Sequence, residues 1–197
     1  NPRQKGCAYP DKNLSGVSIA FKLCEALSSE LGAKDIWKHL DLVALGTVSD
    51  VAPILGENRI LVKEGLKLLG KRASNKGIKA LIKVSGIKKE RIGAFEIGFI
   101  LGPRINAVGR LGSAETAVEL FLTDDDNRAK ELAVKLNQAN QERQRIEKNT
   151  LKEAISKIER EINFKEHRVI VLHSEDWHTG VMGIVASRIS DKFNRPA

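Results

Sequence analysis

Asp50 is a carboxylate at the end of an otherwise apolar segment, a position that suits metal chemistry. The segment covers residues 40–51 and stops before Pro53. Hard divalent cations prefer carboxylate oxygens, and two such cations together stabilise the doubly charged transition state of phosphodiester hydrolysis. Taken from the residue pattern alone, the plainer interpretation is that Asp50 caps a turn over residues 51–55.

Two arginines lie in a stretch rich in glycine, arginine and asparagine, residues 101–112. The guanidinium groups of Arg104 and Arg110 are suited to gripping phosphates, because each can hold two phosphate oxygens at once. Gly102 and Gly109 would let a backbone approach closely. The same residues also fit a tight turn with two surface arginines, and the pattern leaves both interpretations open.

A second candidate phosphate site opens a helix at residues 178–183, where free N–H groups and the positive end of the helix dipole attract anions. Ser187 lies on the same helix face as Gly180, and Arg188 is adjacent. The alternative is that the small residues pack the helix against a strand while Arg188 pairs with Asp191. The sequence does not separate these two interpretations.

Other polar residues favour structural roles. The acidic run at residues 124–126 is typical of a helix N-terminus. His39, His167 and His173 lack the spacing of a metal site. Trp177 suits either stacking on an unpaired base or packing between domains.

The composition is that of a globular protein with a bias toward polyanions. Hydrophobic residues make up 42% of the chain, and 33 lysines and arginines against 25 acids give a net charge of +8, which favours nucleic acid as a partner. Cys7 and Cys24 are too few for a disulfide framework and indicate a reducing compartment. With neither a membrane-length apolar run nor a secretion signal, the chain is predicted to be cytoplasmic.

Helical signals dominate the chain. Ser15 is expected to cap a core-facing helix of about 16 residues that ends at Gly32. Alternation around Val169 to Leu172 predicts a strand at residues 167–173. The other expected helices cover residues 40–51, 57–69 and 77–84, a segment capped by Ser113 with Ala117, Val118, Phe121 and Leu122 facing inward, and residues 123–162 and 181–193.

The predicted helix at residues 123–162 would run roughly 55–60 Å. Its two ends keep a helical rhythm of apolar residues, but residues 137–145 are almost wholly polar. This pattern predicts a strut that crosses solvent between two folded bodies.

Three motifs resemble those of RecJ-type nucleases in the DHH phosphoesterase superfamily. They are LVALGTVSDVAP at residues 42–53, followed by ENR at 57–59, LGPRINAVGRL at 101–111 and WHTGVMGIVASR at 177–188. Their order and spacing match along the entire chain, including the LSGV helix start at residues 14–17. The chain opens on Asn1 and Met182 is its one methionine, so we interpret it as an excerpt of a longer protein.

The resemblance implies an α/β fold class in three parts. Residues 1–122 would be the mostly helical C-terminal part of a DHH domain, residues 123–163 a long connecting helix, and residues 164–197 the beginning of a DHH-associated, substrate-binding α/β domain. The aspartate-rich motifs and the DHH triplet would precede Asn1.

The resemblance also implies site roles. Asp50 would be catalytic and would bind metal in a two-ion Mn²⁺ or Mg²⁺ centre whose remaining ligands lie upstream. The residues implied to contact DNA or phosphate are Arg104, Asn106, Arg110, His178, Gly180, Gly183, Ser187 and Arg188.

The implied function is metal-dependent 5′-to-3′ hydrolysis of single-stranded DNA in repair and recombination, by a monomer that works with single-strand-binding protein and a helicase. The excerpt alone would be inactive. One alternative is a smaller DHH phosphodiesterase acting on dinucleotides or oligonucleotides, against which the polar strut and the motif at 101–111 argue. The other is a catalytically silent DNA-binding replication scaffold, against which the presence of Asp50 argues.

Overall fold

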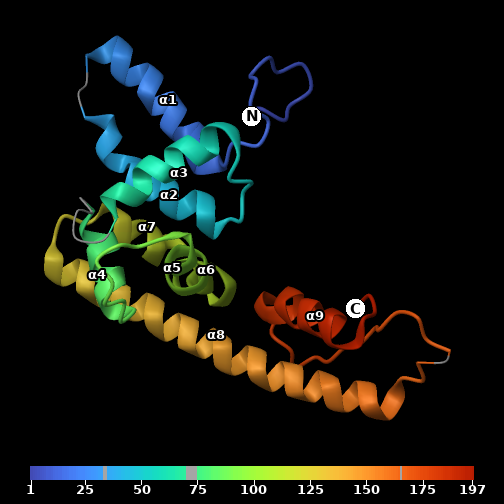
Figure 1. The fold of residues 1–197 in the computed structure, drawn as a ribbon. Helices are drawn as coiled ribbons and strands as arrows, with labels where there is room; N and C mark the ends of the chain where they lie inside the picture. The colour runs from blue at the N-terminus through green and yellow to red at the C-terminus, as the bar shows by residue number, and fades with distance from the viewer. Residues whose placement is uncertain (33–34, 70–74, 165) are drawn as a thin grey trace.

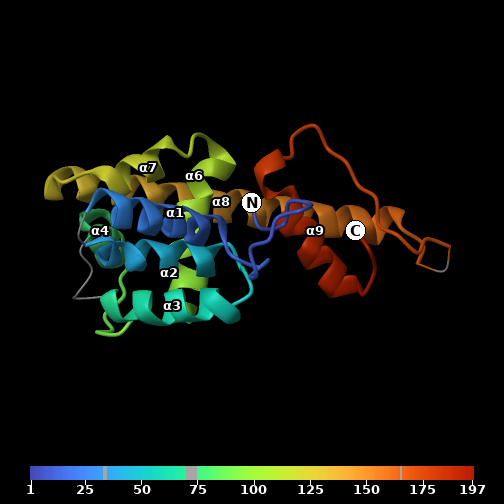
Figure 2. The ribbon, with the colours of Figure 1, turned by 90° about the horizontal axis from the view of Figure 1, so that it is seen from above.

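The computed structural model describes residues 1–32, 35–69, 75–164 and 166–197. Helices α1 to α7 gather around the first half of the long helix α8, and α9 lies along its second half (Figures 1 and 2). The elements are α1 (Gly16–Leu31), the 3₁₀ turn η1 (Ile36–His39), α2 (Leu40–Ser49), α3 (Gly56–Leu68), α4 (Lys76–Val84), α5 (Ala94–Glu96), the π-helical turn η3 (Ile97–Leu101), α6 (Gly102–Leu111), α7 (Glu115–Leu122), α8 (Asp126–Glu161) and α9 (Thr179–Phe193).

Helix α1 has the ends that the sequence predicts. The Ser15 hydroxyl accepts a hydrogen bond from the Ser18 N–H, and Gly32 closes the helix in the left-handed region at φ 65°. The apolar residues of this predicted core-facing helix are only partly buried, because Phe21 is 4% exposed whereas Leu31 is 79% exposed. Helix α1 is therefore anchored to the core through its first half.

Helix α2 is the centre of the larger core. It is buried on nearly all sides, with Val43, Ala44 and Leu45 each at most 2% exposed. Helix α3 packs closely on it, since a Cβ added to Gly65 would lie 2.0 Å from the Leu40 carbonyl oxygen. Helices are confirmed for the segments predicted at residues 40–51, 57–69 and 77–84.

The stretch rich in glycine and arginine is helical, which corrects the tight-turn interpretation. Elements α5, η3 and α6 follow one another without a break from Ala94 to Leu111. Gly102 permits close packing on α2, because a Cβ there would meet the Ser49 hydroxyl oxygen at 2.8 Å. Pro103 lies in the first turn of α6, where a missing N–H costs little.

Helix α7 forms where it was expected, and its inward face was predicted correctly for Ala117 and for Phe121, which packs against the larger core, but not for Val118 and Leu122. Leu120 and Ala117 are buried, whereas Val118 is 56% and Leu122 75% exposed. Packing of α7 against α8 and α4 selects the side that carries Leu120. The Ser113 hydroxyl accepts the Glu115 N–H.

Helix α8 has 36 residues and is about 54 Å long. Ala129, Leu132, Ala133 and Leu136 near its start belong to the larger core. Ala154 and Ile158 near its end belong to a second core with residues of α9. The long-helix prediction is confirmed. In the described part of the chain, no helix is long and apolar enough to cross a membrane.

The polar middle of α8 was predicted to be exposed to solvent, and it is so only in part. Most residues from 137 to 145 are exposed or half-buried, but Asn140 is 3% exposed. Helices α6 and α9 both contact α8, and they also contact each other. One side of the polar stretch is thus covered at the junction of these three helices.

The strand predicted at residues 167–173 does not form, and the described residues include no strand. The Ile170 N–H donates to the Pro196 carbonyl at 2.8 Å, which is a single bond and not a ladder. Ile170 nevertheless packs into the second core. The α/β class is therefore not confirmed, and what is described is helical.

The first testable prediction concerns Asp125, the N-cap of α8. Its carboxylate accepts the N–H groups of Arg128 and Asn127 at 2.9 and 2.7 Å, and these bonds hold the pKa of the Asp125 carboxyl below its ordinary value. A lowered folded-state pKa stabilises the fold above the ordinary carboxyl pKa, and that contribution is lost as the pH falls through the folded pKa. Asp125→Ala should lower Tm by roughly 2–4 °C at pH 7.

The Tm difference between wild type and Asp125→Ala should shrink as the pH falls below about 4. Calorimetric melting from pH 7 to pH 3 measures it. Asp124→Ala is the matched control, because Asp124 is outside the cap. A Tm difference that stays constant across this range would contradict the capping role.

Candidate nucleic-acid interface

Asp50 is the C-cap residue of α2, and its side chain is exposed. Its N–H donates to the Gly46 carbonyl at 3.0 Å. Because the next helix begins at Gly56, Asp50 does not cap a helical turn over residues 51–55, and that alternative is wrong. Val51 then turns the chain in the left-handed region at φ 55°, leaving the carboxylate open to solvent.

The Asp50 carboxylate is suited to be one ligand of a hard cation. Within the described part of the chain, no group binds it, and no cluster of three or more His, Cys, Asp or Glu side chains is placed to hold a metal. A two-ion centre needs several such oxygens. A centre of that kind at Asp50 would therefore draw its other ligands from outside these residues.

Asp50 and Asn106 line the same hollow of about 410 Å³ between α1, α2, α6 and α7. Its walls are mainly apolar, with Leu42, Leu45 and Phe121 among them. The hydroxyl of Ser49, which also lines it, is buried and unpaired within the described structure. The hollow thus brings the predicted metal ligand to one predicted DNA-contact residue.

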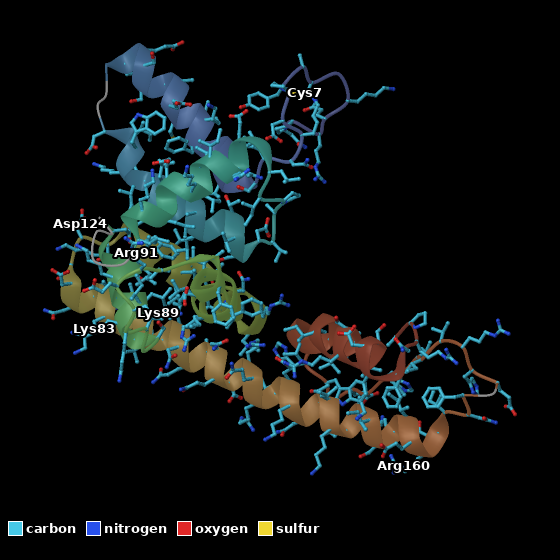
Figure 3. All side chains as sticks on the ribbon, viewed as in Figure 1. Cys7, Lys83, Lys89, Arg91, Asp124 and Arg160 are labelled. Atoms are coloured by element: carbon cyan, nitrogen blue, oxygen red, sulfur yellow. The ribbon has the colours of Figure 1, made fainter. Side chains whose placement is uncertain are left out.

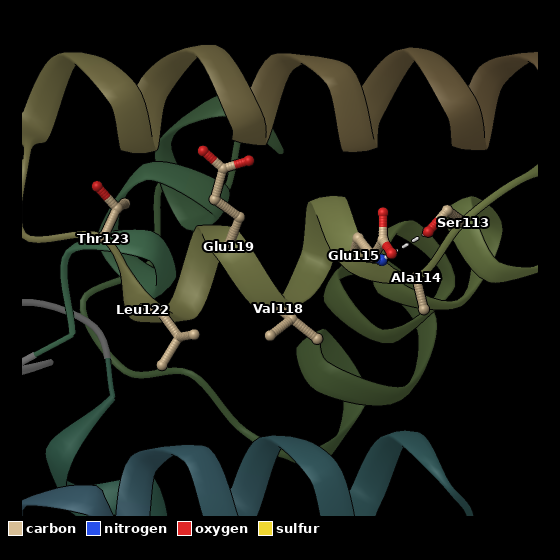
Figure 4. A pocket seen from close by; sticks show the side chains of 7 residues that line it. All are labelled: Ser113, Ala114, Glu115, Val118, Glu119, Leu122 and Thr123. Atoms are coloured by element: carbon tan, nitrogen blue, oxygen red, sulfur yellow. Dashed lines mark hydrogen bonds between the residues drawn. The ribbon is translucent and has the colours of Figure 1, made fainter.

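A second hollow of about 630 Å³ lies along α7. Figure 4 shows Val118 and Leu122 leaving one side of α7 while Glu119 leaves the other. Both apolar residues also line the Asp50 hollow. None of the predicted site residues lines this second hollow, so it is not part of the candidate site.

Arg104 has a structural role. Its Nε donates to the Asn137 Oδ1 at 3.0 Å, and its Nη1 donates to the Ile100 carbonyl at 2.6 Å. Burial of the guanidinium lowers the pKa of Arg104 from its ordinary value. Arg104 therefore ties α6 to α8, and of the two arginines predicted to contact phosphate, Arg110 at the far end of α6 is the exposed one.

Arg110 lies where α6 meets the start of α9. Its Nη1 donates to the Gly180 carbonyl at 3.3 Å, a long bond from an exposed side chain to a backbone oxygen. A Cβ added to Gly180 would lie 2.1 Å from the Arg110 carbonyl oxygen. The small-residue packing interpretation is thus correct for Gly180, although its neighbour is helix α6 and not a strand.

The N-terminus of α9 is partly occupied by its own cap. The His178 Nδ1 accepts the Gly180 N–H at 3.0 Å, and the His178 carbonyl accepts the Val181 N–H at 3.1 Å. These two N–H groups are not free for an anion. The exposed His178 ring and the outer face of α9, with Gly183 and Ser187, remain open to solvent.

Arg188 pairs with Glu147 of α8, not with Asp191. Its Nη2 lies 2.6 Å from the Glu147 Oε1. The second Glu147 oxygen pairs with Arg143, whose Nη2 also donates to the Asn140 Oδ1 at 2.9 Å. The Glu147 side chain is 4% exposed and that of Arg188 is 58% exposed. Two arginines on one carboxylate leave a net positive charge at the junction.

The structure therefore sorts the predicted residues into two neighbouring places. Asp50 and Asn106 share the hollow, whereas Arg110 and Gly180 meet where α6 contacts α9. Arg188 lies about two turns further along α9 and is paired with Glu147 of α8. Asn106 and Arg110 are both exposed and one helical turn apart on α6, so this helix joins the two places.

Sequence reasoning missed Asn137, Asn140 and Glu147, which hold the arginines. The spacing of Arg143 and Glu147, four residues apart on one helix, was the available signal.

Trp177 is a core residue, which excludes base stacking by its ring. It is 9% exposed and packs with Val181 and Ile158. Its Nε1 donates to the Glu153 Oε2 at 2.9 Å, and the Lys157 ammonium lies 5.2 Å from the ring centroid. Trp177 therefore fastens the segment before α9 to α8.

Comparison with known proteins identifies the chain's relatives. No family model matches it. It is 42% identical over its full length to the single-stranded-DNA-specific exonuclease RecJ of Bacillus subtilis and 41% identical to that of Haemophilus influenzae, covering 24% and 36% of them. The chain is a RecJ-like segment. It spans about a quarter to a third of the length of these curated relatives.

Solved RecJ structures share its fold. RecJ from Thermus thermophilus in complex with Mg²⁺ superposes with a TM-score of 0.84 at 39% identity, over 95% of this chain and 29% of that one. An exonuclease RecJ bound to manganese superposes with a TM-score of 0.82 at 39% identity, over 97% and 47%. The helical arrangement around α8 is therefore that of a region of RecJ.

Two glycines of α9 test the junction of this RecJ-like segment. Gly180→Ala should lower the free energy of unfolding by about 1–3 kcal/mol, because the new methyl group would overlap the backbone of α6 at Arg110. Gly183→Ala should raise it by about 0.5–1 kcal/mol, since nothing lies within 4 Å of a Cβ there. Urea unfolding measures both, and a destabilised Gly183→Ala variant would mean that α9 is covered on its outer face.

Proposed function

We propose that the protein to which this chain belongs is a metal-dependent exonuclease that hydrolyses phosphodiester bonds of single-stranded DNA. The observation that carries the proposal is the unbound, exposed Asp50 carboxylate at the end of α2, in a hollow that is also lined by Asn106 on the helix that leads to Arg110. Similarity along the whole chain to proteins named single-stranded-DNA-specific exonucleases supports it.

The proposed cofactor is Mg²⁺ or Mn²⁺, the ions present in the similar RecJ structures. In two-ion hydrolysis such cations activate water and stabilise the charge of the transition state. Asp50 would hold a cation through its carboxylate, with the remaining ligands supplied by other parts of the protein. Its place at the end of the buried helix α2 would fix the position of the carboxylate.

The proposed substrate path runs from the Asp50 hollow along α6 to the junction with α9. There Arg110 and Arg188 keep exposed guanidinium groups, which bind phosphates without regard to base sequence. We further propose domains at residues 1–122 and 164–197 joined by residues 123–163, supported by the separate cores at the two ends of α8.

The finer features rest on the family resemblance alone. They are the 5′-to-3′ direction, the role in DNA repair and recombination, the monomeric state, the cytoplasmic location, and the partnership with single-strand-binding protein and a helicase.

Asp50→Ala in the complete protein tests the catalytic role. Turnover of single-stranded DNA should fall by more than about a hundredfold, because even the outer partners of metal ligands cost 10–100-fold when removed. The Tm of Asp50→Ala should stay within about 2 °C of the wild-type Tm, since the Asp50 side chain is exposed and unbound. Asp191→Ala, another exposed carboxylate, should keep full turnover. Near-normal turnover of Asp50→Ala at saturating Mn²⁺ would remove Asp50 from the metal site.

Arginine substitutions in the 197-residue chain, which we expect to bind single-stranded DNA without cutting it, test the phosphate path. Arg110→Ala should weaken binding to all sequences alike and flatten the log–log salt slope by about 0.7, the loss of one phosphate contact. Arg104→Ala should leave the slope unchanged and lower the free energy of unfolding by about 1–3 kcal/mol, because its hydrogen-bond acceptors lose their donor. A slope altered by Arg104→Ala and not by Arg110→Ala would reverse the assignment.

A further inference from the structure

Two aromatic side chains are exposed to solvent on the continuous helix formed by α5, η3 and α6. Phe95 is 62% and Phe99 73% exposed. Their ring centroids are 5.0 Å apart with an angle of 33° between the planes. The opposite side of the helix is fixed in the core by Ile97 and Leu101, both 0% exposed. The rings are therefore exposed on a firmly held helix, although burying such a ring would contribute favourably to folding.

The backbone under the pair is unusual as well. Residues Ile97–Leu101 form the π-helical turn η3. Such turns are rare within helices and often lie at functional sites. Phe99 is within this turn and Phe95 lies two residues before its start, while Asn106 and Arg110 follow on α6 and are also exposed. Aromatic, amide and guanidinium side chains thus succeed one another along one helix.

Basic side chains lie at both ends of this series of exposed residues. At the start, the Lys89 ammonium lies 2.6 Å from the Glu96 Oε1 and is 70% exposed. That hydrogen bond, with a second from the Gly93 N–H, holds the pKa of the Glu96 carboxyl below its ordinary value. Figure 3 shows Lys89 and Arg91 beside α4, on the segment that enters α5. At the far end lies Arg110, at the junction with α9.

We propose that Phe95 and Phe99 form a stacking platform for unpaired bases, with the phosphates running between Lys89 and Arg110. This deepens the proposed function and rests on it. From Phe95 to Arg110 the helix extends about 22 Å, the length of at most about six nucleotides, the number that a fully stacked strand has at 3.4 Å each. Flat rings flanked by cations are how proteins hold single strands without sequence preference.

The charges favour nucleic acid over an apolar protein partner as the occupant. A docking face for an apolar helix would continue as apolar surface beyond the two rings. Here Lys89 lies in the segment that leads into the helix, and Asn106 and Arg110 are exposed further along it. These groups complement phosphates, and a duplex has no unstacked bases to offer the rings.

The test is equilibrium binding of the 197-residue chain, followed by fluorescence anisotropy with two labelled probes. One probe is an oligothymidylate of about 15 nucleotides, enough to cover the roughly six that the helix spans. The other has the same length with abasic sites throughout. Wild type should bind the thymidylate at least about tenfold more tightly than the abasic strand, as base–aromatic stacking predicts.

Phe95→Ala and Phe99→Ala should each weaken thymidylate binding by about 5–100-fold. The double variant should bind both probes alike, and its salt slope should equal that of wild type because the rings carry no charge. Phe95→Leu with Phe99→Leu keeps apolar side chains but should lose the preference for bases. Leu31→Ala, another exposed apolar residue of a helix, should change nothing. Circular dichroism would establish that each variant is folded.

Three outcomes would overturn the platform. They are a double alanine variant that still distinguishes the probes, a leucine variant that keeps the full preference, and a wild type that binds both probes equally. None of these outcomes would contradict the proposed function. That proposal is tested separately, and it fails if Asp50→Ala of the complete protein retains turnover. If the double alanine variant is unfolded, binding of the two probes by the double leucine variant tests the platform instead.

Discussion

The two hydrophobic cores are built on the two ends of one helix, so the continuity of α8 fixes their separation. Leu132 and Leu136 complete the first core and Ala154 and Ile158 the second. A helix of this length without proline or glycine inside it keeps its hydrogen-bond ladder unbroken. Any group carried by α6 is therefore held at a set distance from any group carried by α9, as long as α8 remains helical.

That arrangement places polar residues of α8 under cover at the junction. Glu147 is a buried carboxylate, and removing a charge from water is costly unless it is paired and hydrogen-bonded. Arg143 and Arg188 supply the pairing, and Asn140 accepts a further bond from Arg143. The close approach of Gly180 to the backbone of α6 completes the contact. The junction is thus specified by charge pairing and by a small residue more than by apolar area.

Features with local signals could be predicted from the sequence. Ser15, Gly32 and Asp125 end or begin their helices as expected, because a cap depends on residues within one turn of it. The tight turn that the stretch with Arg104 and Arg110 also fitted does not form, because the stretch is helical and packs on α2 through Gly102. The strand predicted at residues 167–173 does not form either. The alternation of apolar residues is a property of the segment alone, whereas a strand also needs a neighbouring strand with which to form hydrogen bonds.

For the site, residue types could be predicted but partners could not. Arg104 and Arg110 looked equivalent in the sequence, yet burial and two acceptors make the first structural. The difference depends on Asn137, far away along the chain, whose contact no local pattern indicates. Asp50 was singled out by resemblance, and the structure adds that it is exposed and lines the same hollow as Asn106.

The pairing of Arg188 with Glu147 bears directly on the proposed phosphate path. A guanidinium has five N–H donors in a rigid fork, and the ion pair with Glu147 uses Nη2 of Arg188. Because the side chain remains 58% exposed, its other donors still face solvent. A free arginine loses side-chain entropy when it closes on a phosphate, but Glu147 has already restricted Arg188. The buried carboxylate therefore reduces the net charge of the junction by one while lowering the entropic cost of binding, and the second arginine on it, Arg143, keeps the cluster positive.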